Sequence, residues 1–489
     1  MNTTFKIFVS IWLVYALYVA PAGGVLPNRY QDLTFSIVNE GRFVIDTYHE
    51  NTIDKAYYNG HYYSVALPGP AFIAIPAYLV FKPLYAFLPE NVKQLAGGMQ
   101  SLKKDALADS SFYGRVDNVE FFLAQIFITL TTQATLSALG SVFLFKTLTI
   151  IGFDTRRSII VTFAYAFGTM VFFFSTVFFE QVLTATALIG AFYFLLRGLD
   201  DATLPRRRAF YVLVGGLLVG IGMTFEYIAI FPAGVFGVML LLRKQWSMLL
   251  FYGFGFGLPV FGLMAYNNSI FGSPFTTAYR YIDVAQQKNH DEGFLGITYP
   301  HVERLWGLLL SVERGLFFFG PMTAIGTLGL IYSAFKTRRY REIALLALSI
   351  CLLNLFFFAS IKDWRGGASF GPRYLIPILP FVMLGVAMAF DYLHARIIYA
   401  VMLLSVAIHW LGAQFGFAES PWEHVTQLLD QGPTLPVFGA ILSHSTSRTS
   451  ALYLFAENYH VAVTIGASLL LVLFLGWWWR ELWLPKPTE

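Results

Sequence analysis

Residues 28–69 read NRYQDLTFSIVNEGRFVIDTYHENTIDKAYYNGHYYSVALPG, a long polar stretch in a chain that is otherwise largely apolar. Only one apolar segment precedes this stretch. The stretch itself is rich in tyrosine, in histidines such as His49 and His61, and in acids such as Asp32 and Asp46. Long loops without regular structure are usually functional in folded domains. We therefore expect a site here. For any single residue the alternative is a solvated loop whose charges keep it out of the lipid.

The composition is that of an integral membrane protein. Of 489 residues, 56% are hydrophobic and 13% are charged, and the mean hydropathy is +0.60. Soluble domains carry about 25% charged residues. The apolar segments are long enough for membrane helices of about 20 residues, and no alternating ten-residue pattern indicates a barrel. We therefore predict an all-α polytopic membrane protein. The net charge of +4 gives no reason to expect a nucleic-acid partner.

Basic clusters between the apolar segments predict how the chain crosses the membrane. They are Arg156/Arg157, Arg206 to Arg208, Arg243/Lys244, the run 336–341, Arg396 and Arg480. Such clusters favour the cytoplasmic side. If the proline-interrupted segment 68–89 is an in-plane or re-entrant helix, all of these basic clusters and the N-terminus lie on the cytoplasmic side. This predicts about twelve transmembrane helices. The alternative is about thirteen, with the N-terminus outside and residues 28–69 in the cytoplasm.

In this topology the polar segments share the non-cytoplasmic face. They are residues 28–69, the turns at Glu180 and Glu226, and the loops 267–304, 362–373 and 414–459. We expect a catalytic module over residues 1–396 with an external loop at 21–117. Residues 397–489 are expected to form C-terminal helices with an external loop at about 414–459.

Two acids are candidate catalytic residues. Asp32 follows the first apolar segment, where a carboxylate at the membrane surface could act as a general base. Glu180, in FSTVFFEQV, adjoins a strongly apolar segment. An ionised group near the membrane core is costly and by default marks a site or a buried pair, although Glu180 could simply reach interfacial water. Glu226 in MTFEY raises the same question more weakly.

Residues 362–381 read KDWRGGASFGPRYLIPILPF and combine basic side chains with a glycine-rich turn before an apolar segment. Glycines allow close approach of the backbone, and arginine can bind phosphate through two parallel hydrogen bonds. We predict a phosphate clamp here. An interfacial anchor of tryptophan and arginine is the alternative. The clamp residues would be Lys362, Asp363, Trp364, Arg365, Arg373 and Tyr374.

The loop 267–304 contains histidines and acids that could bind a divalent cation, although their spacing matches no dedicated metal motif. They are Asp283, His290, Asp291, Glu292 and His301. The chain has no P-loop, no dinucleotide fingerprint and no nucleophile elbow. Soluble nucleotide donors are therefore not indicated.

Several of these motifs together resemble the GT-C glycosyltransferases, in particular the bacterial protein O-mannosyltransferase and lipid A aminoarabinose transferase type. Asp32 in RYQDLTFSIV matches an acid that follows the first span of that group. HYYSVALPG at 61–69 resembles its proline-rich segment, Glu180 its second acid, and GPRYLIPILP at 371–380 the start of a late helix. The resemblance extends to about Pro380.

The resemblance implies a GT-C-like fold and transfer of a sugar from a polyprenyl-phosphate carrier. The acceptor would be a lipid, glycan or protein on the external, periplasmic face of the inner cell membrane. Asp32 would deprotonate the acceptor, and Glu180 would position the acceptor or a divalent cation. Membrane lipids are further expected partners. Substrate would be bound by Arg29, His61, Tyr62, Tyr63 and the six clamp residues.

One departure from the family keeps other functions open. Many relatives carry a lysine in the proline-rich segment, where this chain has Val65, Ala66 and Leu67. Either Arg365 and Arg373 supply that charge, or the carrier is handled differently. A transporter or flippase of lipid-linked sugars is one rival, but the chain shows no internal repeat and its charges lie at helix ends. A non-catalytic protein that binds carrier lipid is the other.

Overall fold

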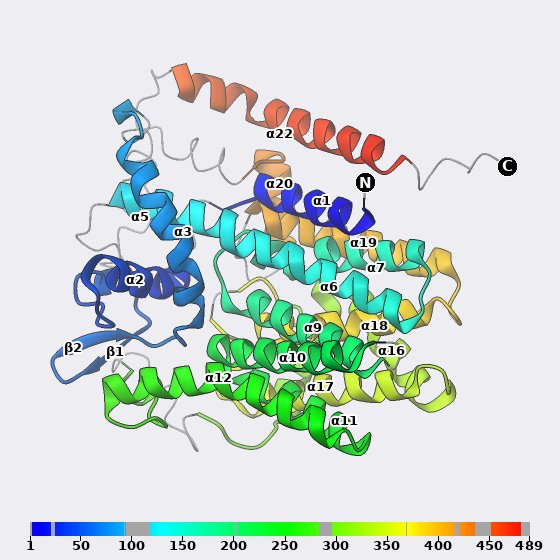
Figure 1. Ribbon diagram of the computed structural model, residues 1–489. Helices are drawn as coiled ribbons and strands as arrows, with labels where there is room; N and C mark the ends of the chain where they lie inside the picture. Colours follow the sequence, from blue (N-terminus) through cyan, green and yellow to red (C-terminus); the bar gives the residue numbers. More distant parts are fainter. Residues whose placement is uncertain are drawn as a thin grey trace.

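The computed structural model is a bundle of long helices that run side by side, with shorter elements gathered at one end (Figure 1). The predicted all-α class is confirmed. Eight described helices are long and apolar enough to cross a membrane, and three further apolar helices are shorter. The total of about twelve crossings stays a prediction. The structure describes residues 2–20, 25–91, 93, 118–200, 203–282, 296–367, 369–415, 421–435 and 451–480.

The long helices form the body of the molecule. They are α1 (Thr3–Leu17), α6 (Thr135–Ile151), α7 (Thr155–Gly168), α9 (Glu180–Leu199), α10 (Pro205–Phe225), α11 (Ile230–Leu242), α12 (Trp246–Phe271), α16 (Pro321–Lys336), α17 (Arg341–Ser360), α18 (Leu379–Ala389), α19 (Ala395–Phe415) and α22 (Ala451–Trp478). A π-helical segment, η2 (Thr129–Ala134), joins α5 (Asn118–Ile128) to α6 in one continuous helix.

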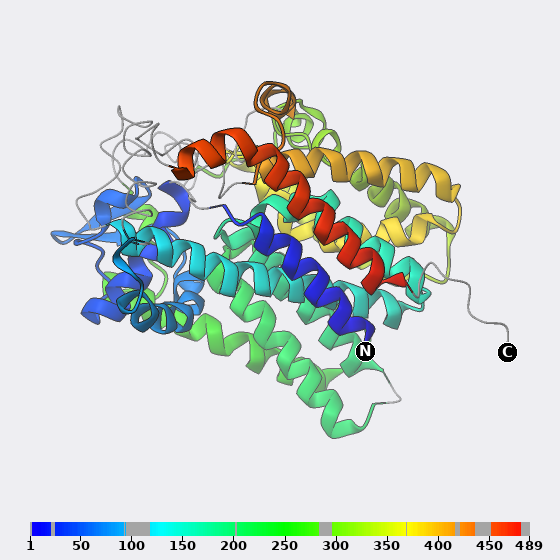
Figure 2. The same cartoon turned by 90° about the horizontal axis from the view of Figure 1, so that it is seen from above.

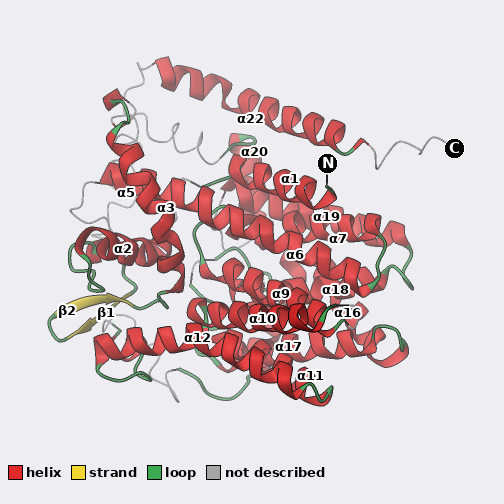
Figure 3. Ribbon diagram, viewed as in Figure 1, coloured by secondary structure: helices red, strands yellow, loops and turns green. Residues whose placement is uncertain are grey.

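The remaining elements include α2, α3 and a strand hairpin, which lie at one end of the molecule, on the left in Figure 3. The helices are α2 (Val25–Glu40), α3 (Gly69–Ala86), α8 (Val171–Ser175), α14 (Val302–Leu310), α15 (Leu316–Phe319) and α20 (Pro421–Gln431). The 3-10 segments are η1 (His49–Asn51), η3 (Tyr227–Ala229), η4 (Ala278–Tyr281) and η5 (Arg373–Ile378). Strands β1 (Lys55–Tyr58) and β2 (His61–Ser64) pair antiparallel, with Lys55 opposite Ser64.

Helix α3 lies across the end of the bundle, roughly perpendicular to the long helices (Figure 1). Its length and composition alone would allow it to span a membrane. Its orientation instead agrees with the predicted in-plane helix in the first external loop. It begins against α10, because a side chain at Gly69 would collide with Thr224. This contact fixes the proline-rich segment beside the end of α10.

Glycines set the close packing of two helix pairs in the bundle. A side chain at Gly216 or Gly255 would collide with the backbone across the α10–α12 contact, and the same is true of Gly329 and Gly385 between α16 and α18. Small residues let membrane helices approach closely and gain van der Waals contact.

Two helices at the centre of the bundle carry charged residues to its polar end. The span of α9 is 72% buried, and all residues of α18 are buried. Glu180 is the first residue of α9, and Arg373 begins η5, which leads directly into α18. Because α18 is buried along its whole length and α9 along most of its length, the packing of these helices holds both charges in place.

The basic turns lie together at the opposite end of the bundle, on the right in Figure 1. Gly152, with φ 99°, closes α6, and Asp154 caps α7 by accepting a hydrogen bond of 2.9 Å from the Arg157 amide. The polar loops and the basic turns therefore occupy opposite ends, as predicted. Which end faces the cytoplasm stays a prediction.

The last described helix, α22, lies over α1 when the molecule is seen from above (Figure 2). Trp479 donates from Nε1 to Ser10 Oγ at 3.0 Å, and Lys6 donates from Nζ to the Trp478 carbonyl at 3.1 Å. These hydrogen bonds join α1 to the end of α22. The division of the chain at residue 396 stays a prediction.

Candidate functional site

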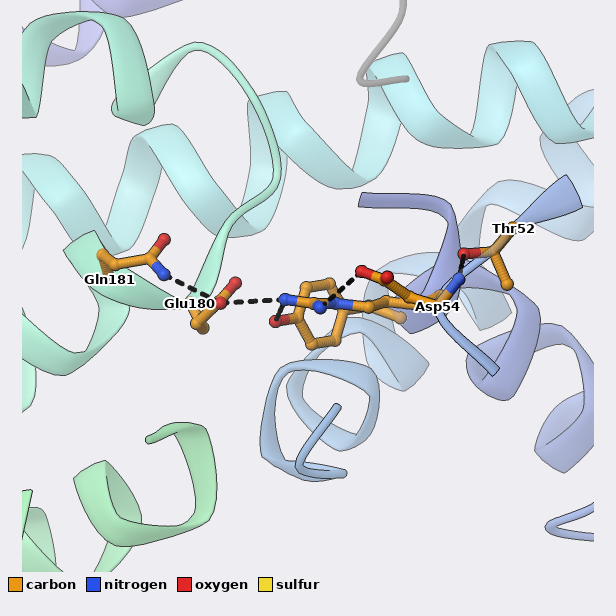
Figure 4. Close-up of polar contacts among 6 residues, drawn as sticks. Thr52, Asp54, Glu180 and Gln181 are labelled. Atoms are coloured by element: carbon orange, nitrogen blue, oxygen red, sulfur yellow. Dashed lines mark hydrogen bonds and ion pairs between the residues drawn. The ribbon is translucent and has the colours of Figure 1, made fainter. Parts of the chain in front are cut away.

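A buried network of charges occupies the polar end of the bundle. Arg29 on α2 donates from Nη1 to Asp54 Oδ2 at 2.7 Å, and from Nη2 to Glu180 Oε1 at 2.9 Å and to the Tyr30 hydroxyl at 2.8 Å. Gln181 donates a further bond of 2.8 Å to Glu180 Oε1. Figure 4 shows the row of contacts from Gln181 and Glu180 across to Asp54. One arginine thus joins Asp54, in the polar stretch 28–69, to the start of α9.

The segment from Asn51 to Asp54 connects this network to Asp32. Asn51 donates from Nδ2 to Asp32 Oδ1 at 3.2 Å, and its carbonyl accepts a bond of 2.9 Å from Asn28. Arg29 and Asp32 are three residues apart on α2 and so share one face of the helix. The fold therefore places the predicted base one helical turn from the ion pairs.

Asp32 is completely buried, and its Oδ2 has no hydrogen-bond partner within the described residues. Burial raises the pKa of Asp32 well above its usual range, while the bond from Asn51 and the charge of Lys55 lower it. A carboxylate with a raised pKa and a free oxygen is suited to accept a proton.

Arg373 is buried at the start of η5, and its Nε and Nη1 groups have no partner in the part of the chain that the structure describes. Its guanidinium lies over the rings of Phe179 and Tyr374, at 5.3 Å from each centroid. It is also close enough to Glu180 for their charges to interact. Buried donors without partners are costly, so these groups are arranged to bind an anion.

Glu226 faces the same network from the end of α10. Its Oε2 is buried and, like Oε2 of Glu180, lacks a partner among the described residues. Burial, followed by the charge of Glu180, raises the pKa of Glu226 above its ordinary value. The protonated acid can therefore persist near neutral pH beside the ionised Glu180.

The predicted phosphate clamp is divided in the structure. Arg365 has 62% of its side chain exposed, lies over the ring of Trp364, and approaches Glu313 at 3.6 Å. The surroundings of Arg365 thus differ from those of the buried Arg373, and joint binding of one phosphate by both stays a prediction. Trp364 packs over Gly307.

The remaining clamp residues surround the same turn. Lys362 and Asp363 are half-buried at its start, and the Lys362 amide donates to the Gly296 carbonyl at 2.9 Å. Tyr374 stacks on Phe358 with ring centroids 4.7 Å apart. These residues therefore build the turn next to Arg373, and their contact with substrate stays a prediction.

The hairpin residues that were expected to bind substrate point in different directions. His61 is half-exposed, with its Nδ1 2.7 Å from Asp46 Oδ2, and Tyr62 stacks on His49 at 4.0 Å between ring centroids. Tyr63 instead is buried and lines a pocket against α12. Of the three, only Tyr63 lines this pocket.

The described residues form no recognisable divalent-cation site, and a bound cation stays a prediction. Nowhere in that part of the chain do three His, Cys, Asp or Glu side chains gather as a metal would require. The oxygens of Glu180 and Glu226 that lack partners among the described residues lie close to the positive charges of Arg29 and Arg373. These charges disfavour the binding of a metal cation at the same place. Four of the proposed ligands, Asp283, His290, Asp291 and Glu292, lie outside the described residues, and His301 stacks on Tyr299.

The sequence predicts that Asp32, Glu180 and Arg373 lie at the same end of the bundle, but it does not predict how these residues are connected. In the structure Arg29 bonds two carboxylates, and its predicted contact with substrate stays a prediction. Asp54 was noted among the polar residues of its loop but was given no role, because an acid in a polar loop looks ordinary. The only signal for Glu226 was its position between two apolar segments.

Comparison with known proteins supports the fold. No family model and no curated protein matches the chain. Among solved structures, the Archaeoglobus fulgidus oligosaccharyltransferase in complex with Zn and sulfate matches 91% of this chain at a TM-score of 0.50 and 15% identity. This chain spans only 58% of that protein.

ArnT from Cupriavidus metallidurans is also similar. The match to its apo structure covers 94% of this chain and 75% of the ArnT chain, with a TM-score of 0.49 and 14% identity. The match to its structure bound to undecaprenyl phosphate covers 95% of this chain and 77% of the ArnT chain, with a TM-score of 0.43 and 12% identity. The oligosaccharyltransferase and ArnT are GT-C proteins. The likeness to the oligosaccharyltransferase confirms the predicted GT-C-like fold.

Proposed function

We propose that the chain is a membrane glycosyltransferase that moves a sugar from a polyprenyl-phosphate carrier to an acceptor hydroxyl on the non-cytoplasmic face. The observation that carries this proposal is the buried Arg373, whose Nε and Nη1 groups lack partners in the described chain. It lies at the same end of the bundle as the buried acid Asp32. A donor pair for an anion and a carboxylate with a free oxygen are the two groups that such a transfer requires.

In the proposed reaction the acceptor hydroxyl loses its proton to Asp32 as its oxygen attacks the anomeric carbon of the sugar. The bond from that carbon to the phosphate oxygen breaks, and the carrier phosphate leaves with the electron pair. Arg373 stabilises the negative charge that develops on the phosphate. A single displacement of this kind inverts the anomeric centre. Glu180 and Asp54 hold Arg29, which fixes α2 and so positions Asp32.

The fold supports a transferase of this class, since its structural likeness is to an oligosaccharyltransferase. ArnT has been crystallised bound to undecaprenyl phosphate, and a solved structure holds the archaeal oligosaccharyltransferase AglB in complex with an inhibitory peptide and a dolichol-phosphate. A carrier lipid of that chemical class is therefore our choice of donor. The apolar helices would lie beside its isoprenoid chain.

A transfer assay with the purified full-length protein and radiolabelled polyprenyl-phosphate sugars tests the proposal. Replacing Asp32 by Asn should lower the rate by about 10²- to 10⁴-fold, the usual contribution of a general base. The matched control is Asp391→Asn, because Asp391 lies at the opposite end of the bundle, where it pairs with Arg157. The control should keep its activity.

The other outcomes decide against parts of the proposal. Unchanged transfer by Asp32→Asn would remove Asp32 from the mechanism. Tight binding of the carrier lipid by the wild type without any turnover would instead support a carrier-lipid-binding protein or a flippase.

A further inference from the structure

Two hydrogen bonds from buried amide side chains join α2 to α5. Gln125 donates from Nε2 to Asn28 Oδ1 at 3.1 Å, and Gln31 donates from Nε2 to the Phe121 carbonyl at 2.6 Å. Asn28 and Gln31 are three positions apart on α2, so they lie on one face of that helix. Phe121 and Gln125 are four positions apart on α5 and likewise share a face. The two bonds therefore fix both the position and the rotation of α2 against α5.

Asn28 also fixes Asn51, the last residue of η1. The Asn51 carbonyl accepts a bond of 2.9 Å from Asn28 Nδ2, and the Asn51 backbone N–H donates to the Tyr48 carbonyl at 2.9 Å. At the start of η1, Lys55 donates from Nζ to the His49 carbonyl at 3.0 Å and so ties η1 to β1. The side chain of Asn51, which is 2% exposed as a residue, thus extends from a backbone that is held on both sides.

The Asn51 side chain treats the two oxygens of Asp32 differently. Its Nδ2 donates to Oδ1 at 3.2 Å, whereas Oδ2 is buried without a hydrogen-bond partner among the described residues. A hydrogen bond from an amide favours the ionised form of a carboxyl group. Because the backbone of Asn51 is fixed, the same oxygen of Asp32 receives this bond while the other stays open to a ligand.

We propose that Asn51 is a positioning residue for the general base: its amide holds Oδ1 of Asp32 and leaves Oδ2 to take the proton of the acceptor hydroxyl. This inference rests on the proposed function and adds a residue to that reaction. The proton moves from the hydroxyl to Oδ2, and the electron pair of the broken O–H bond stays on the oxygen that attacks the sugar. Without Asn51 the carboxylate would turn more freely and would lose a bond that favours its ionised form.

Two titratable groups interact with Asp32 besides the Asn51 amide. Burial raises the pKa of Asp32, while the bond from Asn51 and the charge of Lys55 on β1 lower it. Burial also raises the pKa of Tyr48, which precedes η1, and the charge of Asp32 raises it further.

Other charged groups on the helices around Asp32 bond to other partners. On α2, Arg29 pairs with two carboxylates, and on α5, Glu120 accepts a bond of 2.8 Å from the Tyr78 hydroxyl. Replacing Asn51 leaves all of these groups in the chain. A change in the pH dependence of transfer would therefore report the loss of the Asn51 amide.

The test is the pH profile of sugar transfer by the purified full-length protein with a radiolabelled polyprenyl-phosphate sugar. For Asn51→Ala we expect the rising part of the profile to move up by about one to two pH units, because a hydrogen bond to a charged group is lost. Below the plateau the rate should fall about 10- to 100-fold. Binding of bare polyprenyl phosphate should stay unchanged, because Arg373 is untouched.

Two further variants separate this positioning from a loss of packing. Asn354→Ala is the matched control, because Asn354 is a similarly buried amide that bonds within its own helix, to the Ile350 carbonyl at 3.0 Å. Its profile should stay in place. Asn28→Ala keeps Asn51 but removes the anchor of its carbonyl, so it should move the profile in the same direction by a smaller amount.

Each outcome separates this inference from the proposed function. A uniform loss of rate in Asn51→Ala, with the profile unmoved, would overturn the inference but not the transferase. An equal shift in Asn354→Ala would do the same. If Asn51→Ala does not fold, Asn28→Ala decides, and an unmoved profile in that variant overturns the inference. A wild type that binds polyprenyl phosphate but transfers no sugar would remove the proposed function, and the role of Asn51 would fail with it.

Discussion

The two ends of the bundle use the same kind of ion pair in opposite surroundings. At the basic end Arg157 pairs with Asp391 and Arg243 with Glu342, each at 2.7 Å, and these side chains are 22–61% exposed. At the polar end Arg29 pairs with Asp54 at 2.7 Å and with Glu180 at 2.9 Å, and all three side chains are 9% exposed. Distance alone therefore does not distinguish the two ends.

Burial gives these similar contacts different consequences. Exposed ion pairs usually contribute about 0 to 1 kcal/mol to stability, because water screens them. Buried charges lose their hydration, so removal of one partner leaves the other at a high cost. At the polar end, buried atoms without partners among the described residues belong to acidic and basic side chains, those of Asp32, Glu180 and Arg373, whereas near the basic end they belong to hydroxyl groups such as those of Ser333 and Tyr392. The comparison indicates that the polar end is built for a ligand, whereas the basic end suits the membrane surface.

The largest expected effect on stability comes from Arg29→Ala, which leaves Asp54 and Glu180 buried beside an empty position. We expect it to lower the free energy of unfolding by about 3 to 5 kcal/mol. Arg243→Ala, the matched change at the basic end, should cost at most about 1 kcal/mol. Unfolding of both variants in the same detergent measures the difference. Equal losses would show that the two ends do not differ as described.

Arg373→Ala should weaken the binding of bare polyprenyl phosphate by about 10²- to 10⁴-fold. The variant loses two charge-assisted hydrogen bonds to phosphate, each contributing about 1.5 to 3 kcal/mol. Arg365→Ala is the control, because Arg365 is largely exposed next to Glu313 and should matter much less. Titration of lipid in nanodiscs gives both affinities. A greater loss in Arg365→Ala would assign the phosphate to the exposed arginine instead.

Transfer should depend on pH through Asp32. Because the pKa of Asp32 is raised by burial, the ionised base is scarce in the ordinary carboxyl range. The rate should rise about tenfold per pH unit until that pKa is passed. The folded state holds this proton more tightly than the unfolded state, so ionisation destabilises the fold as the pH rises. Asp32→Asn should therefore be at least as stable as the wild type at neutral pH, and a large loss of stability would contradict this assignment.

The smallest expected effect is that of Glu226→Gln. The raised pKa of Glu226 favours the protonated acid, which an amide resembles in shape and charge. We expect the transfer rate at neutral pH to stay within about threefold of the wild type. Glu180→Gln is the comparison, because it removes an ionised partner of Arg29 and should cost far more. A large loss in Glu226→Gln would mean that its negative charge is needed.

The sequence was informative about the helices and about the end at which the site lies. Long apolar segments and basic turns predict helix positions and orientation through hydrophobicity and charge alone, and the prolines of α3 predict its unusual course. Pairing within the site was not predictable in this way. Asp54 and Glu180 are 126 positions apart in the sequence, and only the tertiary fold brings both of them to Arg29. The different positions of Arg365 and Arg373 likewise depend on how the glycine-rich turn folds.

The central claim is that the buried donors at the polar end bind the carrier phosphate, and a cryo-electron microscopy structure with bound polyprenyl phosphate tests it most directly. The account predicts phosphate density within hydrogen-bond distance of Nε and Nη1 of Arg373. Phosphate at the basic end instead, beside Arg206 to Arg208, would contradict it.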